Sequence, residues 1–394
     1  MLKRGLKIAV ISFLWIAACS SGSGKSPQPN QSDAGGVDAN VATTEDISAL
    51  VEQIRAKYKL PALAAAVYSS EGIQAIGAAG QRSIDDSTEV TVNDKWHLGS
   101  NTKAMTSTLV ARLVDQKRAR WDMNMAEAYP NVKVHAGYQS VTVEQMLAHR
   151  GGVASNPAGM GAAMFVDWQA SQGPRLTQVS KFLAEAPSAE PGRWMYSNAG
   201  YMAAVAWAES PTNTWEQQMQ TEVFGPLGMT ECGFGFAATP GAVDQPWGHS
   251  YDAQSDRYEA VEPGMYADNP RGLGPAGTVH CSLQSWGKFL VAHLKAARGD
   301  ASYLSTDARS HLHTPKPRVD FVDESRYALG WFALSEQWSN GVTLSHNGSN
   351  SMNFTLATVA PGVDRAYAVA SNAGSPAADK ATQELMDAIN ERFH

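Results

Sequence analysis

Patterns typical of β-strands lie at both ends of the folded part of this 394-residue chain, with mostly helical patterns between them. Near the start, residues 64–68 and 73–76 are apolar runs around a Ser-Ser-Glu-Gly turn, which predicts a pair of strands. Further strand patterns occur late in the chain, at residues 327–334, 342–345, 354–359 and 366–370. This order predicts one α/β domain that is interrupted by a mostly helical insertion.

Apolar residues at helical spacing flank these strands. Residues 47–58 predict an amphipathic helix that ends before Pro61, and residues 377–393 predict a final helix. A third helix is expected to begin at Ser100. Two capping-box patterns predict shorter helices in the middle of the chain, at Thr142 with Gln145 and at Thr214 with Gln217.

Residues 1–19 have the features of an export signal. Three basic residues precede an apolar run from Ile8 to Ala18, which is too short to span a bilayer comfortably. The segment Ile16-Ala17-Ala18-Cys19 resembles the lipobox of bacterial lipoproteins, in which the cysteine is lipidated. An ordinary signal peptide cut near Ala17 or Ala18 is the alternative. We expect an exported lipoprotein, anchored through Cys19 at the periplasmic face of the bacterial outer membrane.

Composition and charge limit the remaining possibilities. With 31 Lys and Arg against 38 Asp and Glu, and no basic block, the chain is a poor candidate for nucleic-acid binding. Three cysteines are too few for a disulfide scaffold or a four-thiolate zinc site. The predicted organisation is a signal peptide (1–19), a flexible linker (20–44), an α/β domain (45–125 and 265–394) and a mostly helical insertion (126–264).

Residues 97–103, His-Leu-Gly-Ser-Asn-Thr-Lys, carry the first candidate for chemistry. Positions i and i+3 share one face of a helix, so the hydroxyl of Ser100 and the amine of Lys103 can be neighbours. A serine is a weak nucleophile until a base takes its proton, and a desolvated lysine can act as that base. Ser285 and Lys288 have the same spacing, but they lie in a predicted helix on which Lys288 is solvated.

Two later segments support this interpretation: Tyr196-Ser197-Asn198, and His346-Asn347-Gly348 after a predicted strand. A phenol near an ammonium can relay a proton, and an asparagine side chain can hold a substrate amide. A glycine beside a strand lets substrate backbone approach closely. Each pattern has other matches in the chain, at residues 129–131, 135–137 and 149–151.

In this order the three segments resemble the motifs of the serine β-lactamase and penicillin-binding protein-like hydrolases, in their class C β-lactamase and D-peptidase branch. Flanking stretches resemble the same branch, at residues 146–153, 224–229, 275–278 and 327–331. The resemblance runs from about residue 46 to the C-terminus. It implies an α/β (α+β) fold with an antiparallel sheet, flanked by N- and C-terminal helices, and an inserted helical domain.

The resemblance also implies roles for the first two segments. Ser100 would attack a carbonyl group and form an acyl-enzyme. Lys103 and Tyr196 would share the work of general base and general acid. Asn198 would donate a hydrogen bond to the amide of the acyl group.

The third segment supplies the remaining site residues. The oxyanion hole would use the backbone N–H groups of Ser100 and Ser349, and Asn347 and Gly348 would contact substrate. His346 stands where β-lactamases of this branch usually carry a lysine. It could relay a proton or contact a substrate carboxylate, more weakly than a fixed ammonium. The change argues against efficient β-lactam hydrolysis and leaves acyl transfer intact.

The other histidines and cysteines named below are expected to have structural roles. His97 and His149 are expected to be packing residues. His311-Leu312-His313 could hold a metal. Because no carboxylate accompanies the two histidines in the sequence, positions on the surface or in a strand are favoured for them. We expect no metal and no cofactor. Once Cys19 is lipidated, two cysteines remain, Cys232 and Cys281; a disulfide and two buried thiols are both open.

We therefore expect an exported serine hydrolase that acts on D-amino-acid-containing peptides, as a carboxypeptidase or other peptidase. An esterase or a β-lactamase of the same fold is the alternative enzyme. A non-catalytic penicillin- or wall-binding lipoprotein is the alternative of another class. The complete set of Ser100, Lys103, Tyr196 and His346 favours catalysis. The expected partners are a β-lactam, D-peptide or ester substrate and the membrane, without nucleic acid.

Overall fold

The structure is a computed structural model, and it describes residues 44–156, 175–264, 266–316 and 326–394. The predicted signal peptide, Cys19 and residues 20–43 of the predicted linker lie outside the described residues. Among the described helices, we find none with the length and apolar character needed to cross a membrane.

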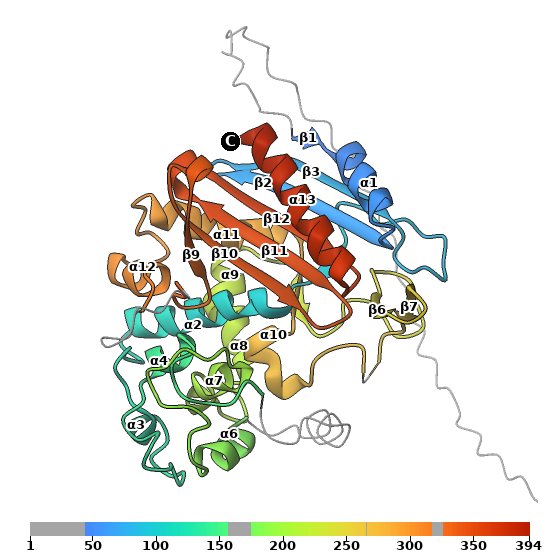
Figure 1. Cartoon of the computed structure of the whole chain (residues 1–394). Coiled ribbons are helices and arrows are strands. Elements are labelled where there is room, and N and C mark those ends of the chain that lie inside the picture. Colours follow the sequence, from blue (N-terminus) through green and yellow to red (C-terminus); the bar gives the residue numbers. More distant parts are fainter. Residues whose placement is uncertain (1–43, 157–174, 265, 317–325) are drawn as a thin grey trace, which may run out of the picture. The chain divides into compact units, whose positions relative to one another are not determined.

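A seven-stranded sheet joins the two ends of the described chain (Figure 1). Its strand order is β1-β3-β2-β12-β11-β10-β9, and all neighbours pair antiparallel except β1 and β3. The strands are β1 (Glu45–Asp46), β2 (Ala62–Ser69), β3 (Gly72–Gly80), β9 (Phe332–Glu336), β10 (Gly341–Ser349), β11 (Phe354–Ala360) and β12 (Arg365–Ser371). The central contact between β2 and β12 confirms the prediction of one sheet made from both ends.

Alternation along the central strands gives the sheet two apolar faces. In β2, Leu63 and Val67 lie in one cluster of buried residues, whereas Ala66 and Tyr68 lie in the other. Helices α1 (Ser48–Lys57) and α13 (Pro376–Phe393) contribute to the first cluster and cover that face in Figure 1. Both predicted terminal helices are thereby confirmed.

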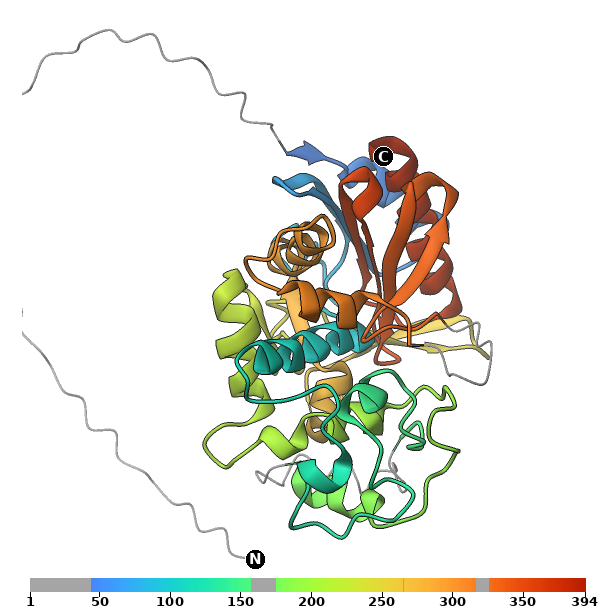
Figure 2. The same ribbon diagram turned by 90° about the vertical axis from the view of Figure 1, so that its left-hand side faces the viewer.

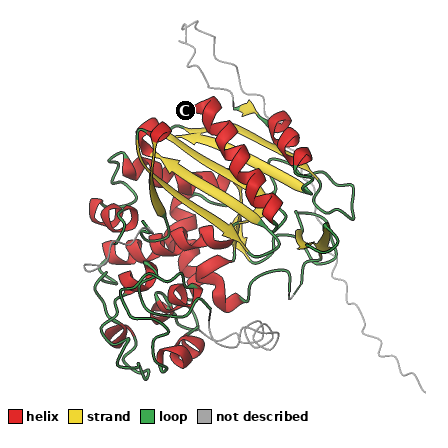
Figure 3. Cartoon of the chain, in the orientation of Figure 1, coloured by secondary structure: helices red, strands yellow, loops and turns green. Residues whose placement is uncertain are grey.

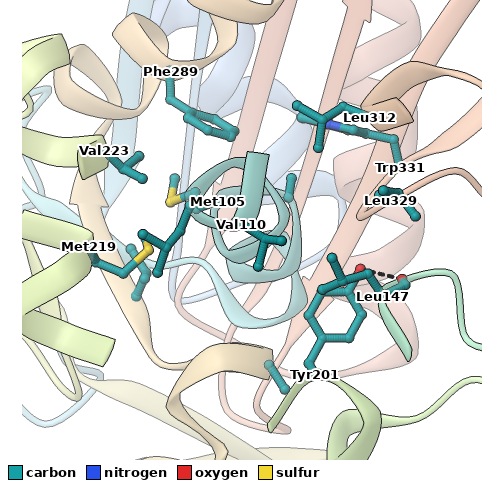
Figure 4. Packing of buried hydrophobic residues seen from close by; sticks show 14 of the residues in the cluster. Met105, Val110, Leu147, Tyr201, Met219, Val223, Phe289, Leu312, Leu329 and Trp331 are labelled. Carbon is teal, nitrogen blue, oxygen red and sulfur yellow. Dashed lines mark hydrogen bonds between the residues drawn. The ribbon is translucent and has the colours of Figure 1, made fainter. Parts of the chain in front are cut away.

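The second face packs on α11 (Leu283–Ala297), and α2 (Thr102–Asp115) lies beneath it, as the turned view in Figure 2 shows. Around α2 the core is large and mostly aliphatic (Figure 4). Met105 and Val110 project from α2 into side chains of several other elements, including Phe289 of α11 and Trp331. A helix buried this completely is held rigidly, which suits a helix that positions reactive groups.

Most other helices lie on the side of α2 that faces away from the main sheet (Figure 3). They are α3 (Met125–Ala128), α4 (Val143–Leu147), α6 (Leu176–Leu183), α7 (Asn198–Ala203), α8 (Trp215–Met219) and α10 (Gly274–Gly277). Helix α9 (Gly225–Leu227) contacts α11, and α12 (Thr306–His313) contacts α2. The predicted capping boxes of α4 and α8 are both present. Short 3₁₀ and π segments complete the described helices, at Gly99–Asn101, Ala206–Ala208, Gln220–Phe224, Arg271–Leu273, Gln337–Ser339 and Pro361–Val363.

Two small sheets accompany the main sheet. One has the order β4-β8-β5, from β4 (Lys95–His97), β8 (Val279–Ser282) and β5 (Cys232–Phe234). The other pairs β6 (Gly248–Asp252) with β7 (Arg257–Val261). Cys232 and Cys281 are register partners of β5 and β8 and form a disulfide. The sequence leaves both a disulfide and two buried thiols open, and the structure has the disulfide.

One strand prediction is wrong in part. The run 327–334 was expected to be a strand, but β9 begins at Phe332, and Tyr327 forms an isolated bridge to that residue. Between them Gly330 has a φ of 85°, and a Cβ there would lie 2.5 Å from Cα of Ala104. The backbone turns here so that it can lie directly against α2, which only glycine permits. Residues 126–264 hold β5, β6 and β7 besides helices, and the proposed domain boundaries stay a prediction.

Candidate active site

The predicted nucleophile lies at the point where the chain enters α2. Ser100 is the middle residue of the 3₁₀ turn Gly99–Asn101, and Lys103 is the second residue of α2. Nζ of Lys103 lies 3.0 Å from Oγ of Ser100 and donates to the carbonyl oxygen of Ala276 at 2.7 Å. The predicted neighbourhood of these two side chains is present.

Burial changes the chemistry of Lys103. The side chain is fully buried, and desolvation lowers its pKa well below the ordinary value of 10.5. A neutral amine has a free lone pair. Because Ala276 takes one N–H, the lone pair can turn to the hydroxyl proton of Ser100, as a general base requires.

Tyr196 lies on the other side of this amine, two residues before α7. Its ring centroid is 4.8 Å from Nζ of Lys103. Burial raises the pKa of Tyr196 to about 12, and a hydrogen bond with the Ser100 side chain opposes part of that shift. The phenol is therefore protonated at neutral pH. The opposite pKa shifts of Lys103 and Tyr196 equip the first as a base and the second as an acid.

His346 of β10 completes the cluster as a neutral group. Its ring centroid lies 6.4 Å from that of Tyr196. Burial is the largest cause that lowers the pKa of His346, to about 3. Its Nε2 accepts a hydrogen bond from the hydroxyl of Tyr327 at 3.1 Å, and Nδ1 bonds to the carbonyl oxygen of Asn347. Both ring nitrogens are thus engaged within the protein.

Three buried aromatic residues around this cluster have no catalytic role in the sequence prediction. Tyr327 contacts His346, and the Lys103 Nζ is 5.6 Å from the ring centroid of Tyr201. The ring of His149 lies 4.3 Å from that of Tyr196, and its Nδ1 accepts the backbone N–H of Ser197. His149 thus packs, as expected, but against the site itself. The flanking stretches 146–153 and 327–331 contain His149 and Tyr327, and they are the sequence signal that could have indicated this neighbourhood.

The backbone of β10 touches the turn that carries Ser100. A Cβ on Gly99, whose φ is 49°, would lie 2.3 Å from the backbone nitrogen of Ser349. A Cβ on Gly348 would lie 2.0 Å from the Leu98 oxygen and 2.8 Å from the Ser100 nitrogen. The two predicted oxyanion donors are therefore brought close together, and glycine is required on each side.

The predicted substrate-binding residues are more loosely placed. Asn198 begins α7, and its Nδ2 donates to Oδ1 of Asn156 at 2.8 Å. Asn347 is exposed, and by strand alternation its side chain points to the face opposite that of His346. Ser349 is exposed beside it. Their roles in binding stay predictions.

Two competing patterns, Ser285 with Lys288 and His311 with His313, have partners outside this cluster. Ser285 and Lys288 do not meet, because Oγ of Ser285 accepts the Glu231 N–H while Lys288 donates to the Gly228 oxygen. His311 contacts Glu144, and His313 bonds to His293. Across the described residues, no group of three or more His, Cys, Asp or Glu side chains is placed to hold a metal.

The fold and this cluster are those of a serine hydrolase, with the buried Lys103 of α2 beside the candidate nucleophile Ser100. Residues 47–390 match the Beta-lactamase family, and the chain belongs to that family. The predicted family and fold are confirmed, whereas the class C branch stays a prediction.

Several known proteins are similar to this chain in sequence. An unguisins hydrolase from Aspergillus violaceofuscus (strain CBS 115571) is 25% identical over 300 residues, covering 70% of this chain and 52% of its own sequence. Penicillin-binding protein 4 from Amycolatopsis lactamdurans is 25% identical over 340 residues, covering 82% and 84%. The chain spans about half the length of the unguisins hydrolases that it matches.

The fold is similar to that of the D-amino acid amidase from Ochrobactrum anthropi SV3, solved in complex with L-phenylalanine amide. The TM-score is 0.69 at 17% identity, with 88% of this chain and 98% of the amidase covered. At this identity the likeness establishes the shared fold.

Proposed function

We propose that this serine hydrolase cleaves peptides or amides that contain D-amino acids, through an acyl-enzyme on Ser100. The observation that carries the proposal is the contact of Ser100 with the buried Lys103 beside the protonated Tyr196. Burial lowers the pKa of Lys103 and raises that of Tyr196, which favours the first as the base and the second as the acid of acyl transfer.

The acylation step follows from these positions. The hydroxyl proton of Ser100 passes to Lys103 while Oγ bonds to the substrate carbonyl carbon. The carbonyl oxygen becomes an oxyanion between the backbone N–H groups of Ser100 and Ser349. Tyr196 then donates its proton to the leaving nitrogen, the C–N bond breaks, and Lys103 returns a proton to the phenolate. A water molecule releases the acyl group by the same steps in reverse.

The substrate class rests on the relatives and on His346. One relative is named a hydrolase of unguisins and another a penicillin-binding protein, and a protein of the same fold is a D-amino acid amidase. Because His346 is neutral, it offers no ammonium for a substrate carboxylate. We therefore favour amide-blocked or internal D-residues over free C-terminal carboxylates. The uncharged site also favours esters as a second substrate class.

The test is intact-protein mass spectrometry of residues 44–394 with penicillin, together with hydrolysis assays on matched D- and L-peptide amides and on p-nitrophenyl acetate. We expect a mass adduct on the wild type, none on Ser100→Ala, and cleavage of the D- but not the L-amide. A stable adduct indicates a D-peptidase, whereas rapid loss of the adduct with consumption of penicillin indicates a β-lactamase.

The outcomes separate the candidates. Hydrolysis of the ester alone, lost in Ser100→Ala, would move the function to an esterase. Unchanged turnover in Ser100→Ala on every substrate would end the proposal of a Ser100 acyl-enzyme.

We also propose that the chain is exported and anchored by lipid on Cys19. The support is the basic and apolar N-terminus with its lipobox-like segment. Full-length protein expressed in a Gram-negative cell is expected to incorporate labelled palmitate and to fractionate with the outer membrane. Cys19→Ala is expected to lose both properties, and labelling that persists in this variant would contradict the anchor.

A further inference from the structure

A buried histidine and carboxylate lie directly behind the nucleophile turn. His97 ends β4, and its Nε2 is 2.6 Å from Oδ1 of Asp268. The two side chains are only 6% and 4% exposed. A carboxylate this buried must be compensated by donors, since an uncompensated charge in the interior is strongly unfavourable.

The other ring nitrogen of His97 reaches the nucleophile turn itself. Nδ1 accepts a hydrogen bond from the backbone N–H of Gly99 at 3.2 Å. Because Nδ1 accepts, the neutral ring carries its proton on Nε2, the nitrogen that lies 2.6 Å from Oδ1 of Asp268. Gly99 immediately precedes Ser100, whose N–H is one of the two proposed oxyanion donors.

The same carboxylate also reaches the second donor strand. Nδ2 of Asn350 donates to Oδ1 of Asp268 at 3.3 Å. The side chain of Asn350 is buried, and its Oδ1 accepts from the Met352 N–H and from Nδ2 of Asn353. Asn350 immediately follows Ser349, whose N–H is the other proposed donor.

A further hydrogen bond connects the loop of Asp268 to the segment that contacts Lys103. Nδ2 of Asn269 donates to the carbonyl oxygen of Gly277 at 2.8 Å. Gly277 is the neighbour of Ala276, whose oxygen accepts from Lys103. Asp268 and Asn269 thus hold, from one loop, the segments next to both oxyanion donors and to the acceptor of the base.

We propose that His97, Asp268 and Asn350 form a positioning network that fixes the spacing between the Ser100 and Ser349 N–H groups. The proposal rests on the serine acyl transfer proposed above, and it does not depend on which acyl substrate is used. The three residues do not touch the reacting atoms. They act by positioning the backbone N–H groups of Ser100 and Ser349. Any reaction that places an oxyanion between these two groups therefore depends on them for its rate.

The test compares His97→Ala and His97→Asn with the wild type in residues 44–394. The asparagine Oδ1 can stand where Nδ1 of His97 stands, so His97→Asn keeps an acceptor for the Gly99 N–H. Four quantities are measured: Tm, kcat and KM for p-nitrophenyl acetate, and the rate at which a fluorophosphonate labels Ser100. The phosphonyl oxygen of that reagent enters the oxyanion hole without any need for a peptide.

His293→Ala serves as the matched control. His293 is a buried histidine that bonds to Thr108 and His313, away from the site. Its removal is expected to lower Tm and to leave kcat within twofold.

For His97→Ala we expect kcat and the labelling rate to fall at least about tenfold with KM within about twofold, because a misplaced donor weakens transition-state contacts. We expect His97→Asn to recover part of that loss, and Asp268→Asn to lose kcat as His97→Ala does. The proposal is overturned if kcat is unchanged, or if its loss follows Tm equally in His97→Ala and His293→Ala. Wild-type labelling without cleavage of D-amides would refute the substrate class alone.

Discussion

At the scale of single residues, the site works by moving two pKa values in opposite directions. Lys103 and Tyr196 are both buried, and desolvation penalises the charged form of each. For a lysine this means a lower pKa and for a tyrosine a higher one. One environment therefore favours the uncharged form of both groups, and both contact Ser100.

The acid side of the pH profile is expected to report Lys103. Only the neutral amine accepts the serine proton, so kcat/KM should rise with pH through the lowered pKa of Lys103 and then level off. His346, with a pKa of about 3, is neutral well above that pH. The measurement is a pH–rate profile of the wild type and His346→Gln, which should share the same acid midpoint.

A midpoint that moves in His346→Gln would contradict this assignment. Lys103→Arg provides the other arm, because a guanidinium stays protonated and cannot act as the base. We expect it to lose at least about 100-fold in kcat, the lower end of what a positioned base contributes.

The sequence predicts the contact of Ser100 with Lys103 better than the residues that support it. This contact follows from helical spacing, which is a local property. His97 was expected to be merely structural, and Asp268 and Asn350 carry no motif. Their contacts depend on a loop and a strand end that meet only in the folded chain, so no local pattern could indicate them.

At the scale of elements, the decisive contact is between β10 and the 3₁₀ turn before α2. Thr355 of β11 strengthens it, because its hydroxyl donates to the Leu98 oxygen at 3.0 Å and accepts from Nδ2 of Asn101 at 2.9 Å. Two backbones can approach this closely only where side chains are missing. Gly99 and Gly348 are therefore requirements of the contact.

Gly348→Ala is expected to force β10 away from the turn, since the new methyl group would lie 2.0 Å from the Leu98 oxygen. We expect a loss of about 1–3 kcal/mol in stability, as for overpacking, and a fall in kcat of about 10–100-fold from the displaced Ser349 donor. Urea unfolding and ester kinetics measure the two effects.

Gly264→Ala is the matched control, because the nearest atom to its new Cβ would be the Glu262 oxygen at 3.8 Å. This variant should resemble the wild type in both measurements. Equal behaviour of the two variants would show that the close approach at Gly348 is not needed.

Elements with regular periodicity were predictable, and irregular ones were not. The terminal helices and the strands β2, β3, β10, β11 and β12 follow from alternation or helical spacing. The turn before β9 was missed, because the run 327–334 is apolar throughout and its apolar residues pack around α2. Burial against a helix and burial within a sheet leave the same apolar signature.

At the scale of the whole molecule, the disulfide joins strand β5 to strand β8. Cys232 and Cys281 are 49 residues apart. Closing a loop of that length in the unfolded chain gives a stabilisation of about 4 kcal/mol by chain entropy, and native disulfides typically contribute about 2–4 kcal/mol. The sequence could not predict this pair, because the register of β5 on β8 brings the cysteines together.

We expect the double variant Cys232→Ser, Cys281→Ser to unfold at lower urea concentration by an amount that corresponds to about 2–4 kcal/mol. Since neither sulfur touches the described site, kcat of the folded fraction should be close to that of the wild type. An unchanged urea midpoint would mean that the unfolded chain gains no freedom when the bond is absent.

The pairing of β2 with β12 has a consequence for how the protein is made. Ala66 lies opposite Ala368, so the centre of the sheet joins one of the first segments to leave the ribosome with one of the last. A nascent chain cannot complete this pairing while synthesis is under way, and strands waiting for so distant a partner fold slowly. Any translation product that stops before residue 365 lacks both β12 and α13. The backbone N–H and C=O groups along one edge of β2 then have no partner strand, and they can pair with another chain or be bound by chaperones.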